Sequence, residues 1–82
     1  MRRIEVYTAD YCPHCRQAEA LLGSEPDVTF INCMECPTLA KRRRIEKLPT
    51  LIYYVDNTEA GRTVGVTKNT IPWLRGECDD FS

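Results

Sequence analysis

Two cysteine pairs with the spacing Cys-x-x-Cys are the residues of this chain best suited to chemistry. Cys12 and Cys15 lie in the stretch YCPHC at residues 11–15, and Cys33 and Cys36 lie in the stretch CMEC. Two thiols at this spacing can be a redox-active pair, half of a metal site or a structural disulfide. The segments around each pair must decide between these possibilities.

The first pair is expected between a strand and a helix. Residues 3–8 (RIEVYT) alternate apolar and polar side chains as a strand does, and the apolar residues within 15–23 recur at helical spacing. A thiol at a helix N-terminus faces unpaired backbone N–H groups, which favour its anion. We therefore expect a lowered pKa at Cys12, which would then be the attacking thiol, with Cys15 one turn later as the resolving thiol.

The two residues between these thiols have separate expected roles. Pro13 fixes the backbone of the turn without removing a needed hydrogen-bond donor. His14 has two interpretations that the residues leave open. It either stabilises the thiolate and makes the disulfide more oxidising, or is a solvated loop residue with little effect.

The remaining chain predicts alternating strands and helices around these thiols. Further strands are expected at 28–31, 51–55 and 62–66, helices at 37–47 and 67–74, and a hairpin turn at Asp56-Asn57 with Gly61. Thr67 is the expected N-cap of the last helix, which Pro72 should keep short or kinked. The order β-α-β-α-β-β-α predicts an α/β fold whose first two strands are parallel and whose last two form an antiparallel hairpin.

Length and composition predict one small domain over residues 1–82. An apolar share of 43% and a charged share of 28% are typical of a folded globular protein and exclude wholesale disorder. No apolar run could cross a bilayer and no export signal follows Met1, so we expect a cytoplasmic protein without membrane contact. The net charge of −1 gives no reason to expect nucleic-acid binding, and the basic run at 41–44 is typical of a solvated helix face that could also dock an acidic partner.

The chain contains five cysteines, which in a reducing compartment indicate redox or metal chemistry more than structural disulfides. Cys78 is the odd thiol and is expected to be incidental. It lies in residues 75–82, which we expect to be a polar, mobile tail. Trp73 is expected to be a packing residue.

Three segments of the chain resemble the thioredoxin/glutaredoxin superfamily, and most closely its small, glutaredoxin-sized thioredoxins. These segments are residues 11–15, residues 31–32 with 37–41, and Leu48-Pro49-Thr50 before an apolar strand. The resemblance extends from residue 4 to about residue 74. It implies a thioredoxin-like fold with a four-stranded mixed sheet, and a thiol–disulfide oxidoreductase that takes part in electron transport.

The resemblance also implies how substrate binds and which partners act. It implies a cis peptide bond at Pro49 and a backbone at Leu48 that pairs with extended substrate. Tyr11 and Thr50 are expected to complete this substrate-binding site. It further implies a monomer without an organic cofactor that acts on disulfide-containing proteins. The reductant would be a dithiol reductase similar to thioredoxin reductase, or glutathione.

The sequence favours a protein reductant over glutathione. Residues 76–80 (GECDD) are similar to the stretch with which glutaredoxins hold glutathione, but they lie too far along the chain, so we treat the match as coincidence. The segment that should correspond to it, residues 65–67, lacks the acidic pair.

The second pair leaves two rival hypotheses. The four thiols fit C-x2-C-x17-C-x2-C, a zinc-site spacing, so a non-enzymatic zinc module is the alternative function. The strand and helix expected between the pairs argue against a zinc ribbon. In the α/β fold, Cys33 and Cys36 should instead lie at the same sheet edge as the first pair, before a helix that could acidify them. They would then be an auxiliary redox dithiol that forms its own disulfide or exchanges with the first, or simply two small packed residues. A weaker third possibility is a binding domain that keeps only the fold.

Overall fold

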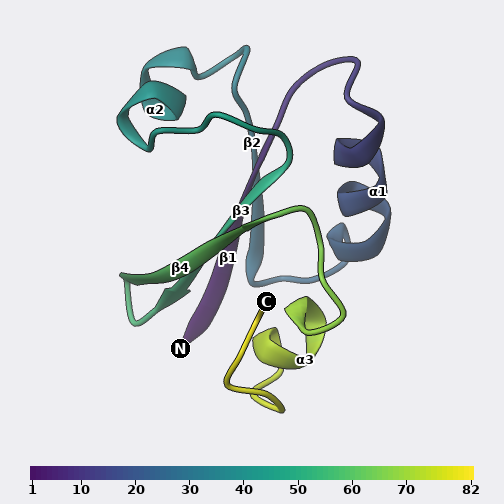
Figure 1. Cartoon of the computed structure of the whole chain (residues 1–82), viewed down its shortest axis with the longest axis vertical. Helices are drawn as coiled ribbons and strands as arrows, with labels where there is room; N and C mark the ends of the chain where they lie inside the picture. Colours follow the sequence, from purple (N-terminus) through teal and green to yellow (C-terminus); the bar gives the residue numbers. More distant parts are fainter.

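The computed structural model describes all of residues 1–82. Its elements are β1 (Arg2–Thr8), α1 (Pro13–Leu22), β2 (Val28–Asn32), α2 (Pro37–Arg42), β3 (Thr50–Val55), β4 (Thr58–Val64) and α3 (Thr70–Leu74). The four strands form one sheet in the order β2-β1-β3-β4 (Figure 1). Strands β1 and β2 are parallel, whereas β3 is antiparallel to both β1 and β4. The predicted four-stranded mixed sheet is confirmed.

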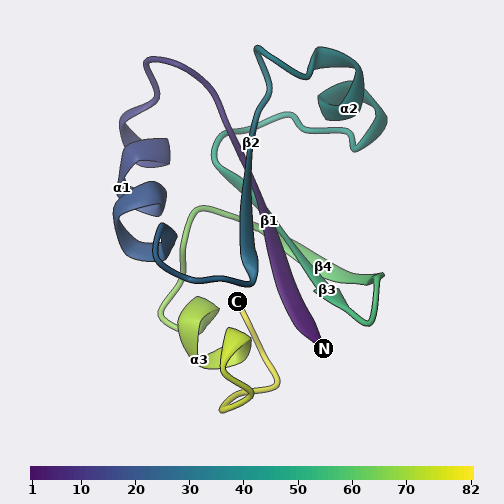
Figure 2. The ribbon, with the colours of Figure 1, turned by 180° about the vertical axis from the view of Figure 1, so that it is seen from behind.

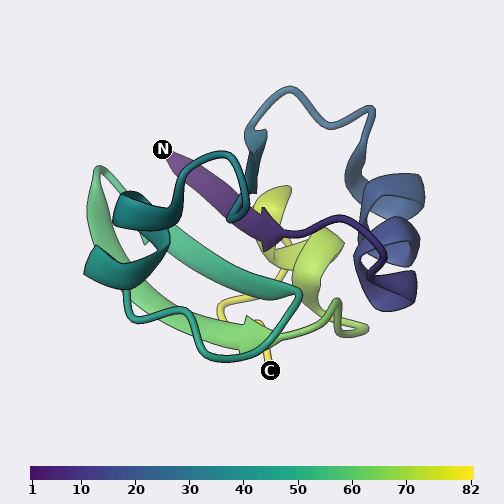
Figure 3. The same ribbon diagram turned by 90° about the horizontal axis from the view of Figure 1, so that it is seen from above.

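The helices divide between the two faces of the sheet (Figures 2 and 3). Because side chains alternate along a strand, the central strands β1 and β3 supply both faces. One cluster packs against α1 and α3: Ile4, Val6, Ala18, Leu22, Leu51, Tyr53 and Trp73. A smaller cluster of Tyr7, Ile52 and Tyr54 packs against residues of the α2 side. Trp73 is 2% exposed, so the prediction that it is a packing residue is confirmed.

The hairpin between β3 and β4 is tighter than predicted. Asp56 and Asn57 have φ of 50° and 69°, the two positive values that a two-residue type I′ turn requires. Strand β4 therefore begins directly after them, instead of at residue 62. Gly61 lies inside the strand opposite Tyr53, next to a register shift, and is not part of the turn.

Helix α2 is shorter than the predicted helix at 37–47, because the chain closes it at Arg42. Arg44 adopts a left-handed conformation with φ of 57°. The backbone N–H of Arg44 donates to the Lys41 carbonyl at 3.1 Å, and that of Ile45 donates to the Ala40 carbonyl at 3.0 Å. This pair of bonds is a Schellman motif, which ends a helix and is usually marked by glycine.

Helix α3 begins at Thr70, so the prediction of a helix that starts after Thr67 is wrong. The Oγ1 of Thr67 instead accepts a hydrogen bond from the backbone N–H of Asn69, the N-cap, at 3.1 Å. Pro72 therefore lies in the first turn, where a missing N–H leaves no helical bond unmade. The helix is short, as predicted.

The last residues pack against the sheet, which corrects the expectation of a mobile tail at 75–82. The ring of Phe81 stacks on Tyr53 with centroids 4.1 Å apart and meets Trp73 edge-on at 5.7 Å. The guanidinium of Arg2 donates to the carbonyls of Trp73 and Cys78, at 2.8 and 2.7 Å. These contacts hold the C-terminal segment against the sheet.

Candidate functional site

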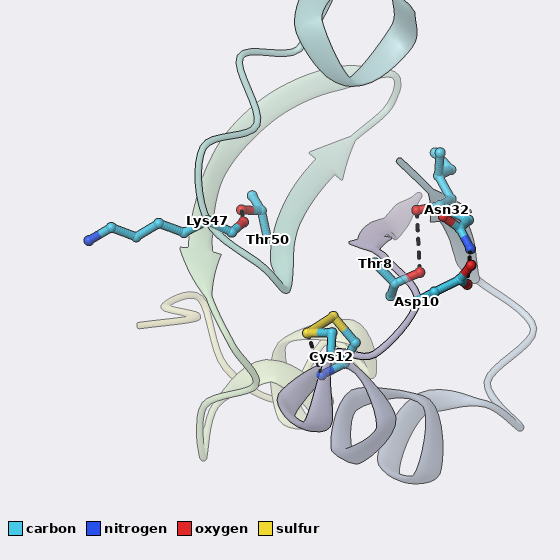
Figure 4. The surroundings of a disulfide bond; sticks show 8 residues. Thr8, Asp10, Cys12, Asn32, Lys47 and Thr50 are labelled. Atoms are coloured by element: carbon cyan, nitrogen blue, oxygen red, sulfur yellow. Dashed lines mark hydrogen bonds between the residues drawn. A yellow bond between two sulfur atoms is a disulfide. The ribbon is translucent and has the colours of Figure 1, made fainter. Parts of the chain in front are cut away.

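Cys12 and Cys15 form a disulfide at the start of α1, where β1 delivers the chain to the edge of the sheet (Figure 4). Their Cα atoms are 5.2 Å apart. Cys12 is partly exposed, whereas Cys15, in the first turn of α1, is 1% exposed. An incoming disulfide can therefore reach Cys12 and not Cys15.

The start of α1 provides electrostatic support for a negative charge at Cys12. Cys12 is the N-cap of the helix, and its Sγ accepts a hydrogen bond from the backbone N–H of Cys15 at 3.3 Å. Pro13 occupies the first helical position, and the first turn contains no carboxylate that would repel an anion. The helix has ten residues, so its macrodipole also favours a thiolate here.

The turn before β3 lies beside the disulfide. The peptide bond between Leu48 and Pro49 is cis, as the family resemblance implies. The Oγ1 of Thr50 donates to the Lys47 carbonyl, and the backbone N–H of Gly65 donates to the Pro49 carbonyl at 2.9 Å. Figure 4 shows Lys47 and Thr50 across from the disulfide. Thr50 is 4% exposed, so its side chain holds this turn in place from inside.

A groove of about 330 Å³ lies along α1 and includes His14, the residue directly before Cys15. Its walls come from α1, the cis-proline turn and the end of β4, and consist of His14, Gln17, Ala18, Leu21, Leu48, Pro49, Val64, Gly65 and Val66. Of the predicted substrate-binding residues, Leu48 and Pro49 line it. Tyr11 does not line it and is 91% exposed, with φ of 60°.

Six of the nine groove residues were not among the predicted site residues: Gln17, Ala18, Leu21, Val64, Gly65 and Val66. A signal for two of them exists, because His14, Gln17 and Leu21 are three and then four residues apart, a spacing that places them on one helix face. Val64 gives no such signal, because only the fold brings the end of β4 next to α1. Leu21 and Val64 are 54% and 61% exposed and form an apolar rim.

The second cysteine pair lies at the same sheet edge but on the other face. Cys33 is half-buried against the cluster on the α2 side, and Cys36 is exposed. Both are free thiols. No three His, Cys, Asp or Glu side chains are grouped so that they could hold a metal ion, so the four cysteines do not converge and the zinc module has no support.

The expectation that the second pair is acidified is not met at Cys33. Burial raises the pKa of this thiol, and the neighbouring Cys36 raises it further. Helix α2 has six residues, and its N-cap, Cys36, makes no side-chain hydrogen bond to it. The stabilisation that α1 gives to Cys12 is therefore not repeated here.

A hydrogen-bonded bridge joins the loops that carry the two pairs (Figure 4). The Nδ2 of Asn32 donates to Asp10 Oδ1 at 3.0 Å, and the backbone N–H of Met34 donates to Asn32 Oδ1 at 2.8 Å. The backbone N–H of Cys33 donates to the carbonyl of Thr8, the last residue of β1, at 2.8 Å. Asn32 belongs to a segment that carries the family resemblance, but the sequence analysis predicted no role for its side chain.

Comparisons with known proteins agree with this geometry. A thioredoxin from Methanocaldococcus jannaschii is 37% identical over an alignment of 57 residues, and the match covers 61% of this chain and 67% of that protein. The protein Trxlp from Edwardsiella tarda superposes with a TM-score of 0.70 at 25% identity, over 89% of this chain and 81% of its own. The oxidized mitochondrial thioredoxin 3 of Saccharomyces cerevisiae superposes with a TM-score of 0.68 at 21% identity, over 92% and 77% of the two chains. No family model matches the sequence.

A four-stranded mixed sheet with a Cys-x-x-Cys disulfide at the start of a helix defines a thiol–disulfide oxidoreductase with a thioredoxin fold. The chain belongs to the thioredoxin family. None of its three helices combines the length and apolar character that crossing a bilayer requires.

Proposed function

We propose that this protein reduces disulfide bonds in other proteins, with Cys12 as the nucleophile and Cys15 as the resolving thiol. The observation that carries the proposal is the difference in exposure between the two thiols, next to an open groove. Cys12 is accessible and supported as an anion, whereas Cys15 is buried within reach of Cys12 alone.

The reaction proceeds in two exchanges at sulfur. The thiolate of Cys12 attacks one sulfur of the substrate disulfide, forms a mixed disulfide and releases the other substrate sulfur as a thiolate. The thiolate of Cys15 then attacks Cys12 Sγ, which releases the second substrate thiolate and leaves the Cys12–Cys15 disulfide seen here. Two electrons have passed to the substrate, and a reductant must return them to the protein.

The groove supports binding of an extended protein segment. Neither the backbone N–H nor the carbonyl of Leu48 has a hydrogen-bond partner within the chain, so both can pair with a substrate backbone. Pro49 and His14 both line the groove, and His14 lies between the two active-site cysteines in the sequence. We assign contact with the substrate to these three residues and to the exposed ring of Tyr11. Thr50 holds the turn, and Pro13 holds the start of α1.

A protein dithiol, similar to thioredoxin reductase, is the reductant that the groove favours. None of the groove-lining residues is Asp, Glu, Lys or Arg. Glutathione carries two carboxylates and an ammonium group, and such charges are bound best by oppositely charged partners when they leave water. A dithiol protein needs only apolar contact and backbone pairing. The protein would then pass electrons from that reductase to disulfide substrates.

We also propose that the protein acts as a cytoplasmic monomer. The three additional thiols, Cys33, Cys36 and Cys78, are free, a state that a reducing compartment maintains. The groove is built by elements of one chain, so no second copy is needed to complete it.

Trapping of the mixed disulfide tests the assignment of the two thiols. The Cys15→Ser variant should accumulate a covalent complex between Cys12 and a disulfide-containing protein such as insulin with its disulfides intact, whereas Cys12→Ser should form none. Peptide mass mapping identifies the linked cysteines. A complex through any other cysteine in Cys15→Ser, or equal trapping by Cys12→Ser, would refute the assignment.

The reductant is tested by turnover. Turnover of the protein should be faster with a thioredoxin reductase than with glutathione, and the reverse order would refute the proposed reductant.

A further inference from the structure

The second cysteine pair is not used in the proposed reaction, although its geometry suits a disulfide. Cys33 and Cys36 lie in one tight turn, because the backbone N–H groups of Glu35 and Cys36 both donate to the carbonyl of Asn32, at 3.1 and 3.0 Å. Residues three apart on such a turn have Cβ atoms about 5–6 Å apart. A small closing movement of the turn would bring the two sulfurs to bonding distance.

This turn is connected to the active-site loop through Asn32. The Asn32 side chain accepts from the backbone of Met34, inside the Cys-x-x-Cys turn, and donates to Asp10, two residues before Cys12. Figure 4 shows the side chains of Asp10 and Asn32 facing each other. A change in the turn therefore acts on the residue that orients Asp10.

A second connection runs through the backbone. The N–H of Cys33 donates to the carbonyl of Thr8, where β1 ends and the active-site loop begins. Between Thr8 and Cys12 the chain passes through Tyr11 in a left-handed conformation, which a non-glycine residue keeps only when its surroundings hold it. Cys33 and Met34, in the first half of the turn, are thus both connected to the segment that presents Cys12.

We propose that Cys33 and Cys36 form a second, reversible disulfide that regulates the active-site pair through the hydrogen bond between Asn32 and Asp10. Closing the turn shifts Met34, which releases the Asn32 side chain and with it the Asp10 carboxylate. The equilibrium between the dithiol and disulfide forms of the active-site pair changes as a result. Direct exchange between the pairs is not needed, and their location on opposite faces of the sheet does not favour it.

The oxidant in this step is a low-molecular-weight disulfide, RSSR. The Cys36 thiolate attacks one sulfur, the S–S bond breaks, and RS⁻ leaves. Cys33 then attacks Cys36 Sγ as a thiolate and releases the second RS⁻. The two protons from the protein thiols end on two RSH, and two electrons pass from the protein to the oxidant. Cys36 attacks first because it is exposed, whereas Cys33 is half-buried and burial raises its pKa.

Formation of the second disulfide can be tested when it is the only one possible. A Cys12→Ser/Cys15→Ser/Cys78→Ser variant retains only the second pair and is treated with glutathione disulfide. We expect both thiols to disappear and the mass to fall by that of two hydrogen atoms, reversibly with a dithiol. Thiols that stay free, or that end with glutathione attached, overturn the proposal.

Regulation is tested by redox titration of the full chain in dithiol buffers. Trypsin cuts after Arg16 and Lys41, so each pair lies on its own peptide and mass mapping gives the state of both at every potential. Replacing the second pair, by Cys33→Ala/Cys36→Ala, should change the dithiol–disulfide equilibrium constant of the first pair by about fivefold or more. Asn32→Ala should remove this difference between proteins with and without the second pair.

An unchanged equilibrium constant while the second disulfide forms overturns the regulatory role. If the double replacement does not fold, Cys36→Ala alone suffices, because Cys36 is exposed and its loss already prevents the disulfide. Coupling between the two pairs must also be reciprocal. Loss of the first pair should therefore change the dithiol–disulfide equilibrium constant of the second pair by the same factor. Neither measurement uses a protein substrate, so both outcomes are independent of the proposed function.

Discussion

Glu5 is a largely buried carboxylate in the middle of β1, on the sheet face that α2 covers. Its Oε1 accepts from the hydroxyls of Tyr7 and Tyr54, at 2.9 and 3.0 Å, and its Oε2 accepts from Arg3 Nη1 at 3.1 Å. Burial alone would raise the pKa of Glu5, but these three hydrogen bonds and the charge of Arg3 together lower it below 4.5. Glu5 thus connects β1 to β3 through a polar network inside a small core.

We expect Glu5→Gln to destabilise the fold at pH 7 by about 1–3 kcal/mol, because an amide replaces an ionised acceptor and brings a donor with no partner. The lowered pKa also makes stability depend on pH. The contribution of Glu5 is present above about pH 4.5 and is lost as the pH falls through the lower pKa of the folded state. Glu5→Gln should flatten this acid dependence, as measured by urea denaturation between pH 7 and pH 3. The control is Glu46→Gln, at an exposed carboxylate without a hydrogen bond, and an equal loss in both variants would contradict the prediction.

Among single residues, the sequence predicted those whose role depends on residues close to them along the chain. Cys12 and Cys15 follow from spacing and from the strand and helix around them, and Pro49 from a three-residue motif. No role was predicted for Asn32 or Glu5, because their partners are distant in the sequence. Asn32 contacts Asp10 only when β2 pairs with β1, and Glu5 contacts Tyr54 only when β3 pairs with β1.

Two helices of the chain end in the same motif with different residues. Both α2 and α3 close with a Schellman motif, and the left-handed residue is Arg44 after α2 but Gly76 after α3, with φ of 57° and 76°. A side chain in this conformation is strained, whereas glycine is not. The left-handed residue that ends α2 therefore destabilises the fold more than the one that ends α3.

We expect Arg44→Gly to stabilise the protein by up to about 1 kcal/mol, because it relieves the left-handed conformation at an exposed position. Arg42→Gly, two residues earlier and inside the helix, should instead destabilise it by about 0.5–1 kcal/mol. Gly76→Ala should be destabilising for the reverse reason. Urea denaturation of the three variants provides the comparison, and a loss of stability in Arg44→Gly would show that the Arg44 side chain makes a compensating contribution.

The boundaries of the elements were predicted least well, because distant contacts decide where a helix ends. The basic residues 41–44 have good helix propensity and no glycine follows them, so a local pattern extends the helix to residue 47. The structure ends it at Arg42, and Ile45 and Leu48 instead pack toward the cluster on the α2 side. Tertiary burial of these two residues outweighed local preference.

The whole molecule depends on the contact between its last residues and the middle of the sheet. Phe81 lies over Gly61, and a Cβ added at Gly61 would be 2.5 Å from Phe81 Cζ. Glycine is therefore the residue that lets the ring reach Tyr53 and Trp73. The sequence could not predict this contact, because one phenylalanine in a polar segment gives no periodic signal.

We expect Phe81→Ala to lower the free energy of unfolding by about 2–3 kcal/mol, somewhat less than for a fully buried phenylalanine. Gly61→Ala should cost about 1–3 kcal/mol, because it displaces the ring. In the Phe81→Ala background, however, Gly61→Ala should cost little, since no ring remains to be displaced. A double-mutant cycle by denaturant unfolding measures this coupling, and additive effects would contradict it.

Trp73 determines what optical experiments can report about this protein. It is the single tryptophan of the chain, it is buried beneath Phe81 with Arg2 above its ring, and it does not line the groove. Its fluorescence should therefore respond to the docking and release of the C-terminal segment and give a signal for folding kinetics. It should be nearly silent when the active-site disulfide opens. Stopped-flow emission would follow assembly of the molecule, while its catalytic cycle must be followed by the mass of the thiols.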